Sequence, residues 1–185
     1  MNDIAQLWLP IVASSVLVFV ASSLIHMVFK WHNSDYRKLA NEDEVMAAIR
    51  AASPRPGQYV MPHCLDMKAM GEESTQKKFR VGPVGFLTLR KNGPPSMGPS
   101  LIQWFLLVLV IAVVAASLAL QSYGLHGDSR RAGHLVGMVS LLAYACGAVQ
   151  AGIWMGKPWG SVAKDLLDAV IYATVSALTF MWLWP

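Results

Sequence analysis

The sequence predicts an all-α membrane protein, a four-transmembrane-helix bundle with a small cytoplasmic α+β insert. Three observations lead to this fold class. Hydrophobic residues make up 55% of the 185 residues and charged residues only 14%, whereas charged residues are about a quarter of a soluble domain. The apolar residues gather in four blocks of about 20 residues, the length that crosses a bilayer core as a helix. The polar residues are concentrated in the single segment 31–99.

Each block is expected to be a helix, because a helix satisfies its own backbone hydrogen bonds in lipid. The blocks run approximately over Trp8–Phe29, Leu101–Leu120, His134–Met155 and Lys164–Trp184. The first block is interpreted as a retained span because the tail MNDIAQ lacks the basic residues of a signal peptide. The expected division is residues 1–30 for the first helix, 31–99 for the insert and 100–185 for the other three helices.

The distribution of basic residues predicts the orientation, because cytoplasmic loops carry the excess of Lys and Arg. Ten of the fifteen basic residues lie in segment 31–99. Both termini are therefore expected outside and the insert inside, at a bacterial cytoplasmic (inner) membrane. The tryptophans lie at or near the span ends, as in an aromatic belt.

The insert has its own expected structure. Asn41 is expected to cap a short helix with Glu44 at the third position, and the segment 53–57 ends that helix. Residues 58–61 are expected to form a strand, 67–78 a broken helix, and 79–89 strand material bent at Gly82. The net charge of +3 over residues 31–99 suits an anionic lipid surface, but a solvated loop explains it equally well. The bilayer is the expected partner, and no nucleic acid is expected.

Ionisable residues inside the spans form the first candidate site, because they are costly in a bilayer. His26, Asp165 and Asp168, with the neutral Gln150, are expected at one depth in the cytoplasmic third of the bundle, with His26 close to Asp168. This level is interpreted as a proton or cation site, as interhelical hydrogen bonding that fixes the helix register, or as simple solvent contact.

A second candidate is a cluster of soft donors in the insert, namely Met61, His63, Cys64 and Met67. Thioether, thiolate and imidazole groups suit Cu(I) or zinc, but one Cys beside one His does not supply the paired spacing of a structural zinc site. Packing of the methionines is the favoured interpretation, and no cofactor is expected. Gly133, Gly137 and Gly147 are interpreted as small residues that let helices approach closely.

Several segments resemble a family of small bacterial four-helix membrane proteins with a cytoplasmic insert between spans one and two, a family with no known activity. The resemblance covers most of the chain after span one and lies in Trp31-His32 with Asp35-Tyr36, Asn41-Glu42-Asp43, Pro56-Gly57 with Tyr59, Gly82-Pro83-Val84-Gly85, Met97-Gly98-Pro99, Ile153-Trp154-Met155-Gly156 and Trp182-Leu183-Trp184-Pro185. It implies a bacterial cytoplasmic-membrane protein and transfers no catalytic residue.

Three functions remain open on the sequence. The first is a non-catalytic accessory or scaffold component of a membrane assembly, with a membrane-protein partner or as a homo-oligomer. The second is a proton- or cation-coupled transporter that uses His26, Gln150 and Asp168. The third is a lipid-active enzyme at the interface, with the pair Asp165 and Asp168. No nucleophile-elbow, zincin or phosphate-loop motif is present, so the sequence leans away from an enzyme.

Overall fold

The computed structural model describes residues 3–185 and divides the chain into two compact units. One unit joins the N-terminal segment as far as Tyr36 to Ser96–Pro185, and the other is Arg37–Pro95. The first unit holds the long apolar helices and the second holds the small sheet. Residues 31–36, which the sequence assigned to the insert, therefore belong to the helical unit.

Four helices of the first unit are long and apolar enough to cross a membrane, which confirms the four-span fold. A short α1 (Asp3–Gln6) precedes them, and a 3-10 helix η2 (Trp31–Asp35) follows the first span. The first span consists of α2 (Trp8–Ser23) continued by the π-helix η1 (Leu24–Phe29), and the others are α6 (Met97–Tyr123), α7 (Ser129–Met155) and α8 (Trp159–Leu183). The last three each begin several residues before the expected apolar block.

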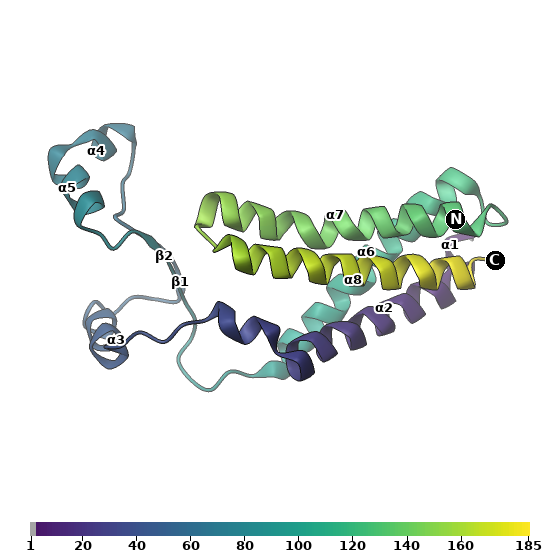
Figure 1. The fold of residues 1–185 in the computed structure, drawn as a ribbon, viewed down its shortest axis with the longest axis horizontal. Coiled ribbons are helices and arrows are strands. Elements are labelled where there is room, and N and C mark those ends of the chain that lie inside the picture. The colour runs from purple at the N-terminus through teal and green to yellow at the C-terminus, as the bar shows by residue number, and fades with distance from the viewer. Residues whose placement is uncertain (1–2) are drawn as a thin grey trace. The chain divides into compact units, whose positions relative to one another are not determined.

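The core of the bundle changes character along its length. Near α1 and the C-terminal end of α8, alanines of α6 such as Ala115 and Ala119 pack against Leu7, Val136 and Phe180 with no exposed surface. Toward the other end, a second cluster contains Val18, Ile25, Val108 and Tyr172. Figure 1 shows that α1 and the end of α8 share one end of the bundle, while η1 and the start of α6 share the other. The first end is therefore densely filled with small and apolar side chains.

Close packing of α7 against α8 explains two of the three predicted packing glycines. A Cβ atom on Gly133 would lie 2.6 Å from the Ala177 carbonyl oxygen, and one on Gly137 would lie 2.9 Å from Ala177 Cβ. Both positions therefore require glycine. Gly147 has nothing within 4 Å of its Cβ position, so its predicted packing role is wrong, because α7 at that level lines a cavity rather than a neighbouring backbone.

The second unit is the small α+β insert that the sequence predicts. It contains α3 (Glu42–Ala51), β1 (Gly57–Met61), α4 (Met67–Gly71), α5 (Glu73–Val81) and β2 (Gly85–Leu89). The two strands pair antiparallel, with Gly57 opposite Leu89 and Met61 opposite Gly85. The helix expected to be broken is two helices, and Asp66 caps the first by accepting a hydrogen bond of 2.7 Å from the Ala69 amide.

Two local predictions in this unit are wrong. The Asn41 side chain makes no capping hydrogen bond, because its backbone (φ −113°, ψ 44°) lies outside the extended region that aims a cap at the first turn. Residues 79–81 are helical rather than extended, since the helix-favouring run before them continues until Gly82, whose φ of 71° ends it.

A matched pair of substitutions tests the close packing of α7 on α8. Gly133→Ala and Gly147→Ala add the same methyl group and gain the same helix propensity, but only the first meets backbone atoms. We expect Gly133→Ala to be less stable than Gly147→Ala by about 1–3 kcal/mol, the usual cost of overpacking. Thermal unfolding in detergent, followed by tryptophan fluorescence, measures the difference. Equal midpoints for the two variants would contradict the packing described here.

Candidate functional site

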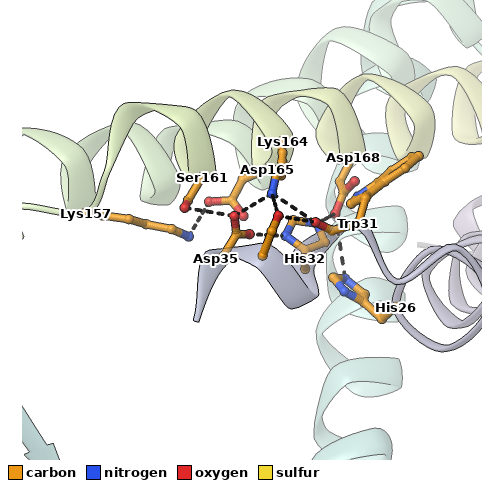
Figure 2. A network of polar contacts seen from close by, with 10 residues as sticks. His26, Trp31, His32, Asp35, Lys157, Ser161, Lys164, Asp165 and Asp168 are labelled. Atoms are coloured by element: carbon orange, nitrogen blue, oxygen red, sulfur yellow. Dashed lines mark hydrogen bonds and ion pairs between the residues drawn. The ribbon is translucent and has the colours of Figure 1, made fainter. Parts of the chain in front are cut away.

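Charged and polar side chains gather at the end of the bundle where span one stops (Figure 2). They come from η1, η2, the short α7–α8 connection and the first half of α8. We call this set the His–Asp network, and its members are His26, His32, Asp35, Lys157, Ser161, Lys164, Asp165 and Asp168.

An irregular backbone brings span one into this network. The hydroxyls of Ser22 and Ser23 both donate to the Phe19 carbonyl oxygen at 2.9 Å, a contact that competes with the regular helical bonds and bends helices. The helix then widens into the π-helix η1, which carries His26, and ends with the Lys30 amide bonded to the Ile25 carbonyl at 3.0 Å. Single π turns inside helices are frequent at functional sites.

Lys30 lies between the π-helix η1 and the 3-10 helix η2. Its φ of 54° is left-handed, a conformation that costs a non-glycine residue energy and persists only where surrounding contacts fix it. The following 3-10 helix η2 lies against α8, as Figure 2 shows. This turn places His32 and Asp35 beside the charged face of α8.

The His32 ring lies between two carboxylates from different elements. Nδ1 lies 2.8 Å from Asp35 Oδ2, and Nε2 lies 2.9 Å from Asp168 Oδ2. An ionised carboxylate only accepts hydrogen bonds, so each ring nitrogen donates when both carboxylates are charged. The His32 side chain is 14% exposed. It joins the end of span one to the middle of α8.

Lys164 uses its ammonium group to fix η2 to α8. It donates to the Trp31 carbonyl at 2.9 Å, to Ser34 Oγ at 2.7 Å and to Asp35 Oδ1 at 2.7 Å, which satisfies all three of its donors. Ser161 Oγ also donates to Asp35 Oδ1, at 3.0 Å. The bond from Lys164 holds the pKa of the Asp35 carboxyl at about 2, below its usual 3.8, with help from His32 and Ser161.

The charges of the network do not balance without the histidines or a bound cation. Lys157 pairs with Asp165, and Lys164 pairs with Asp35. Asp168 has no lysine or arginine partner among residues 3–185, and its ion-pair partners there are the two imidazoles. Two lysines therefore face three carboxylates, and the remaining negative charge lies on Asp168.

Asp168 is the most deeply buried charged group of the network. Its side chain is 7% exposed, and among residues 3–185 its Oδ1 atom has no hydrogen-bond partner. His26 lies on its other side, with Nε2 3.7 Å from Oδ2, and the His26 side chain is 52% exposed. The two histidine rings lie 4.8 Å apart between centroids. Asp168 thus receives one hydrogen bond and has a second imidazole within reach.

Two cavities adjoin the network. One of about 450 Å³ extends between the spans and is lined by His26, Asp165 and Asp168 together with the aromatic side chains Trp104, Tyr144 and Tyr172. The other, of about 420 Å³, is lined by His26, His32, Asp35 and Asp165 among others. His26 and Asp165 border both cavities, so a small ligand has room on either side of His26.

The structure brings together three of the four residues of the predicted polar level. His26, Asp165 and Asp168 are in the network, and the predicted proximity of His26 and Asp168 is present. Gln150 is not part of it, because this side chain is exposed on α7 and lines neither adjoining cavity. Counting residues along a span predicts how far along the helix Gln150 lies. It does not predict the direction in which the side chain points.

Sequence reasoning missed His32, Asp35 and the role of Lys164. His32 and Asp35 follow the apolar block of span one, so the argument from the cost of burying charge in lipid did not apply to them. Their i, i+3 spacing places both on one side of a single turn, and this spacing was the available signal.

The soft donors of the insert show no comparable convergence. Met61 is partly exposed and borders a groove, Met67 is 79% exposed, and His63 is exposed. Cys64 is half-buried as a free thiol. Among residues 3–185, His26, His32 and Asp168 form the only group of three His, Cys, Asp or Glu side chains whose ligand atoms lie within reach of a single ion.

No protein-family model, no curated protein and no solved structure matches this chain. The resemblance to a bacterial membrane-protein family therefore stays a prediction. The four spans define the chain as a multi-pass membrane protein, and its function has to be argued from the geometry alone.

Proposed function

We propose that the protein is a non-catalytic accessory or scaffold component of a membrane assembly. The observation that carries this proposal is an apolar groove on the surface of the 37–95 unit. The groove has a volume of about 510 Å³ and lies between the C-terminal half of α5 and the turn before β2. Its lining includes Met61, Pro62, Val81 and Pro83, with Lys77 and Lys78 beside them. An apolar surface bordered by polar residues is typical of a protein-interaction site.

Val81 supports this interpretation of the groove. It is 77% exposed although it is apolar and sits at the end of α5. The unit carries a net charge of +4 over residues 37–95. A partner segment with an apolar anchor and neighbouring acidic residues complements both the groove and the lysines beside it.

The His–Asp network supports a structural role for the membrane unit. Each of its lysines pairs with a carboxylate of the same chain, and His32 contacts two carboxylates at once. Such mutual pairing fixes the end of span one and η2 against α8. It holds the point at which the chain leaves the bundle, which suits a protein that carries a second unit for others to bind.

A proton- or cation-coupled carrier is the second candidate. The buried Asp168, with one oxygen unpartnered among residues 3–185 and a cavity beside it, favours this function. A carrier also needs a passage to the other membrane face. Residues such as Ala115, Ala119, Val136 and Phe180 fill that part of the bundle without exposed surface, so we rank this function below the first.

A lipid-active enzyme ranks third. The two carboxylates proposed for it have separate partners, since Asp165 pairs with Lys157 and Asp168 contacts the histidines. Although both line the 450 Å³ cavity, neither carboxylate is free of a partner, as a general base that takes a proton from a substrate has to be.

The proposed location is a bacterial inner membrane, with both termini outside and the 37–95 unit in the cytoplasm. The basic residues of the insert support this orientation. Reporter fusions after Asn92 and Pro185 test it, and we expect an inside signal from the first and an outside signal from the second. An outside signal at Asn92 would refute the orientation.

The accessory function is tested by the size of the complex extracted from native membranes. We expect the wild type, solubilised in mild detergent, to migrate on native gels well above the size of a single chain. Val81→Glu places a charge in the groove and should return the protein to the size of one chain. Because Val81 is exposed, its replacement should leave thermal stability within about 0.5 kcal/mol.

Val84→Glu is the matched control, because Val84 is 60% exposed on the same unit but does not line the groove. It should behave like the wild type. The proposal fails if the wild type migrates as a single chain or if both variants retain the larger size. A larger species formed by the purified chain alone would indicate a homo-oligomer instead of an accessory to another protein.

A further inference from the structure

We propose that His26, His32 and Asp168 form a binding site for a divalent transition-metal ion, with zinc as the best match. The ligand atoms are His26 Nε2, His32 Nε2 and Asp168 Oδ2. They come from three elements, η1, η2 and α8, and all lie within 4.8 Å of one another. This inference is independent of the accessory function, because the site lies in the helical unit and the groove lies in the 37–95 unit.

The separations fit ligands around one ion. Bonds of about 2.0–2.2 Å to nitrogen and oxygen place two ligands of a tetrahedral ion roughly 3.3–3.5 Å apart. Nε2 of His32 and Nε2 of His26 lie 2.9 Å and 3.7 Å from Asp168 Oδ2. These values lie on either side of the required separation. To admit the ion, His32 Nε2 has to move away from Asp168 Oδ2 and His26 Nε2 has to move toward it.

The surroundings of His32 match those of a metal-ligating histidine. Such a histidine usually donates its other ring nitrogen to a carboxylate, which fixes the tautomer and the ring orientation. His32 Nδ1 lies 2.8 Å from Asp35 Oδ2, and Asp35 is itself held by Lys164 and Ser161. Nδ1 therefore carries the proton in the metal-bound form, and the lone pair of Nε2 points to Asp168.

The charge of Asp168 supplies the second independent observation. Its carboxylate is more than nine-tenths buried, has no lysine or arginine partner, and keeps Oδ1 unpartnered among residues 3–185. A buried charge needs a compensating partner. A divalent cation provides that partner, and either carboxylate oxygen can bind it.

Backbone irregularity appears at the same place. His26 lies in the π-helix η1, and the left-handed Lys30 separates η1 from η2, which carries His32. Both irregularities thus lie between or beside the two imidazoles. Unusual backbone conformations of this kind concentrate at ligand-binding sites.

The donor set selects the class of metal. Two imidazoles and one carboxylate suit zinc and its first-row neighbours, whereas magnesium and calcium prefer oxygen ligands only. Three protein ligands leave at least one position open, as in zinc sites that bind water or an exogenous ligand. The cavities of about 450 and 420 Å³ that border His26 give this position room and access.

The experiment uses the full-length protein, purified in detergent with a tag that contains no histidine. Zinc binding is measured by competition with a chromophoric chelator, and cobalt is used as a spectroscopic probe of the ligand set. We expect one zinc ion per chain, no competition from magnesium, and a higher unfolding temperature in the presence of zinc. A ligand that binds only the folded chain stabilises that chain by mass action.

Three variants assign the site. His26→Ala should abolish stoichiometric binding and the zinc-induced rise in unfolding temperature while leaving the fold intact, because this side chain is half exposed. Asp35→Asn should weaken binding about 10- to 100-fold, the usual effect of changing a partner of a ligating histidine. His126→Ala removes an exposed histidine of the α6–α7 connection and should change nothing.

Three outcomes would overturn the proposal. One is the absence of stoichiometric zinc in the folded wild type. Another is unchanged affinity in His26→Ala. The third is loss of binding in the double variant His63→Ala/Cys64→Ser, which would assign the metal to the insert. None of these results bears on the size of the native complex, so the accessory function stands or falls separately.

Discussion

Burial of the Asp168 carboxylate is the constraint on which the polar end of this bundle depends. A charged group within a span is costly unless it is paired, and Asp168 is nearly inaccessible. Two imidazoles lie beside it, His26 from the end of span one and His32 from η2. The segment that carries these imidazoles consists of the π-helix, the left-handed Lys30 and the 3-10 helix. Lys164 then fixes η2 to α8 through its bonds to Trp31 and Asp35.

The two ends of the bundle are stabilised by different means. At the end that carries α1 and the C-terminus, small residues allow close helix approach, as Gly133 and Gly137 do against Ala177. At the other end, aromatic side chains and cavities replace that tight packing, and the network supplies the specific contacts. The bundle thus has a closely packed half and a polar, more open half.

The sequence predicted the four spans because a run of about 20 apolar residues is a strong and local signal. It also predicted that His26 and Asp168 lie close together, since a common level follows from counting residues along each helix. It failed for Gln150 and Gly147 because the direction of a side chain around a helix depends on packing with neighbours. It missed His32 and Asp35 because the left-handed conformation of Lys30, which comes before η2, has no local signal comparable to glycine.

The contact between His32 and Asp168 tests this account most directly. In lipid bilayers, with zinc removed by a chelator, solid-state NMR measures the dipolar coupling between labelled Nε2 of histidine and labelled Cγ of aspartate. A separation of 2.9 Å between Nε2 and Oδ2 predicts a strong coupling that disappears in His32→Gln and in Asp168→Asn. A spectrum without this coupling, or one that both substitutions leave unchanged, would contradict the claim that Asp168 organises the site.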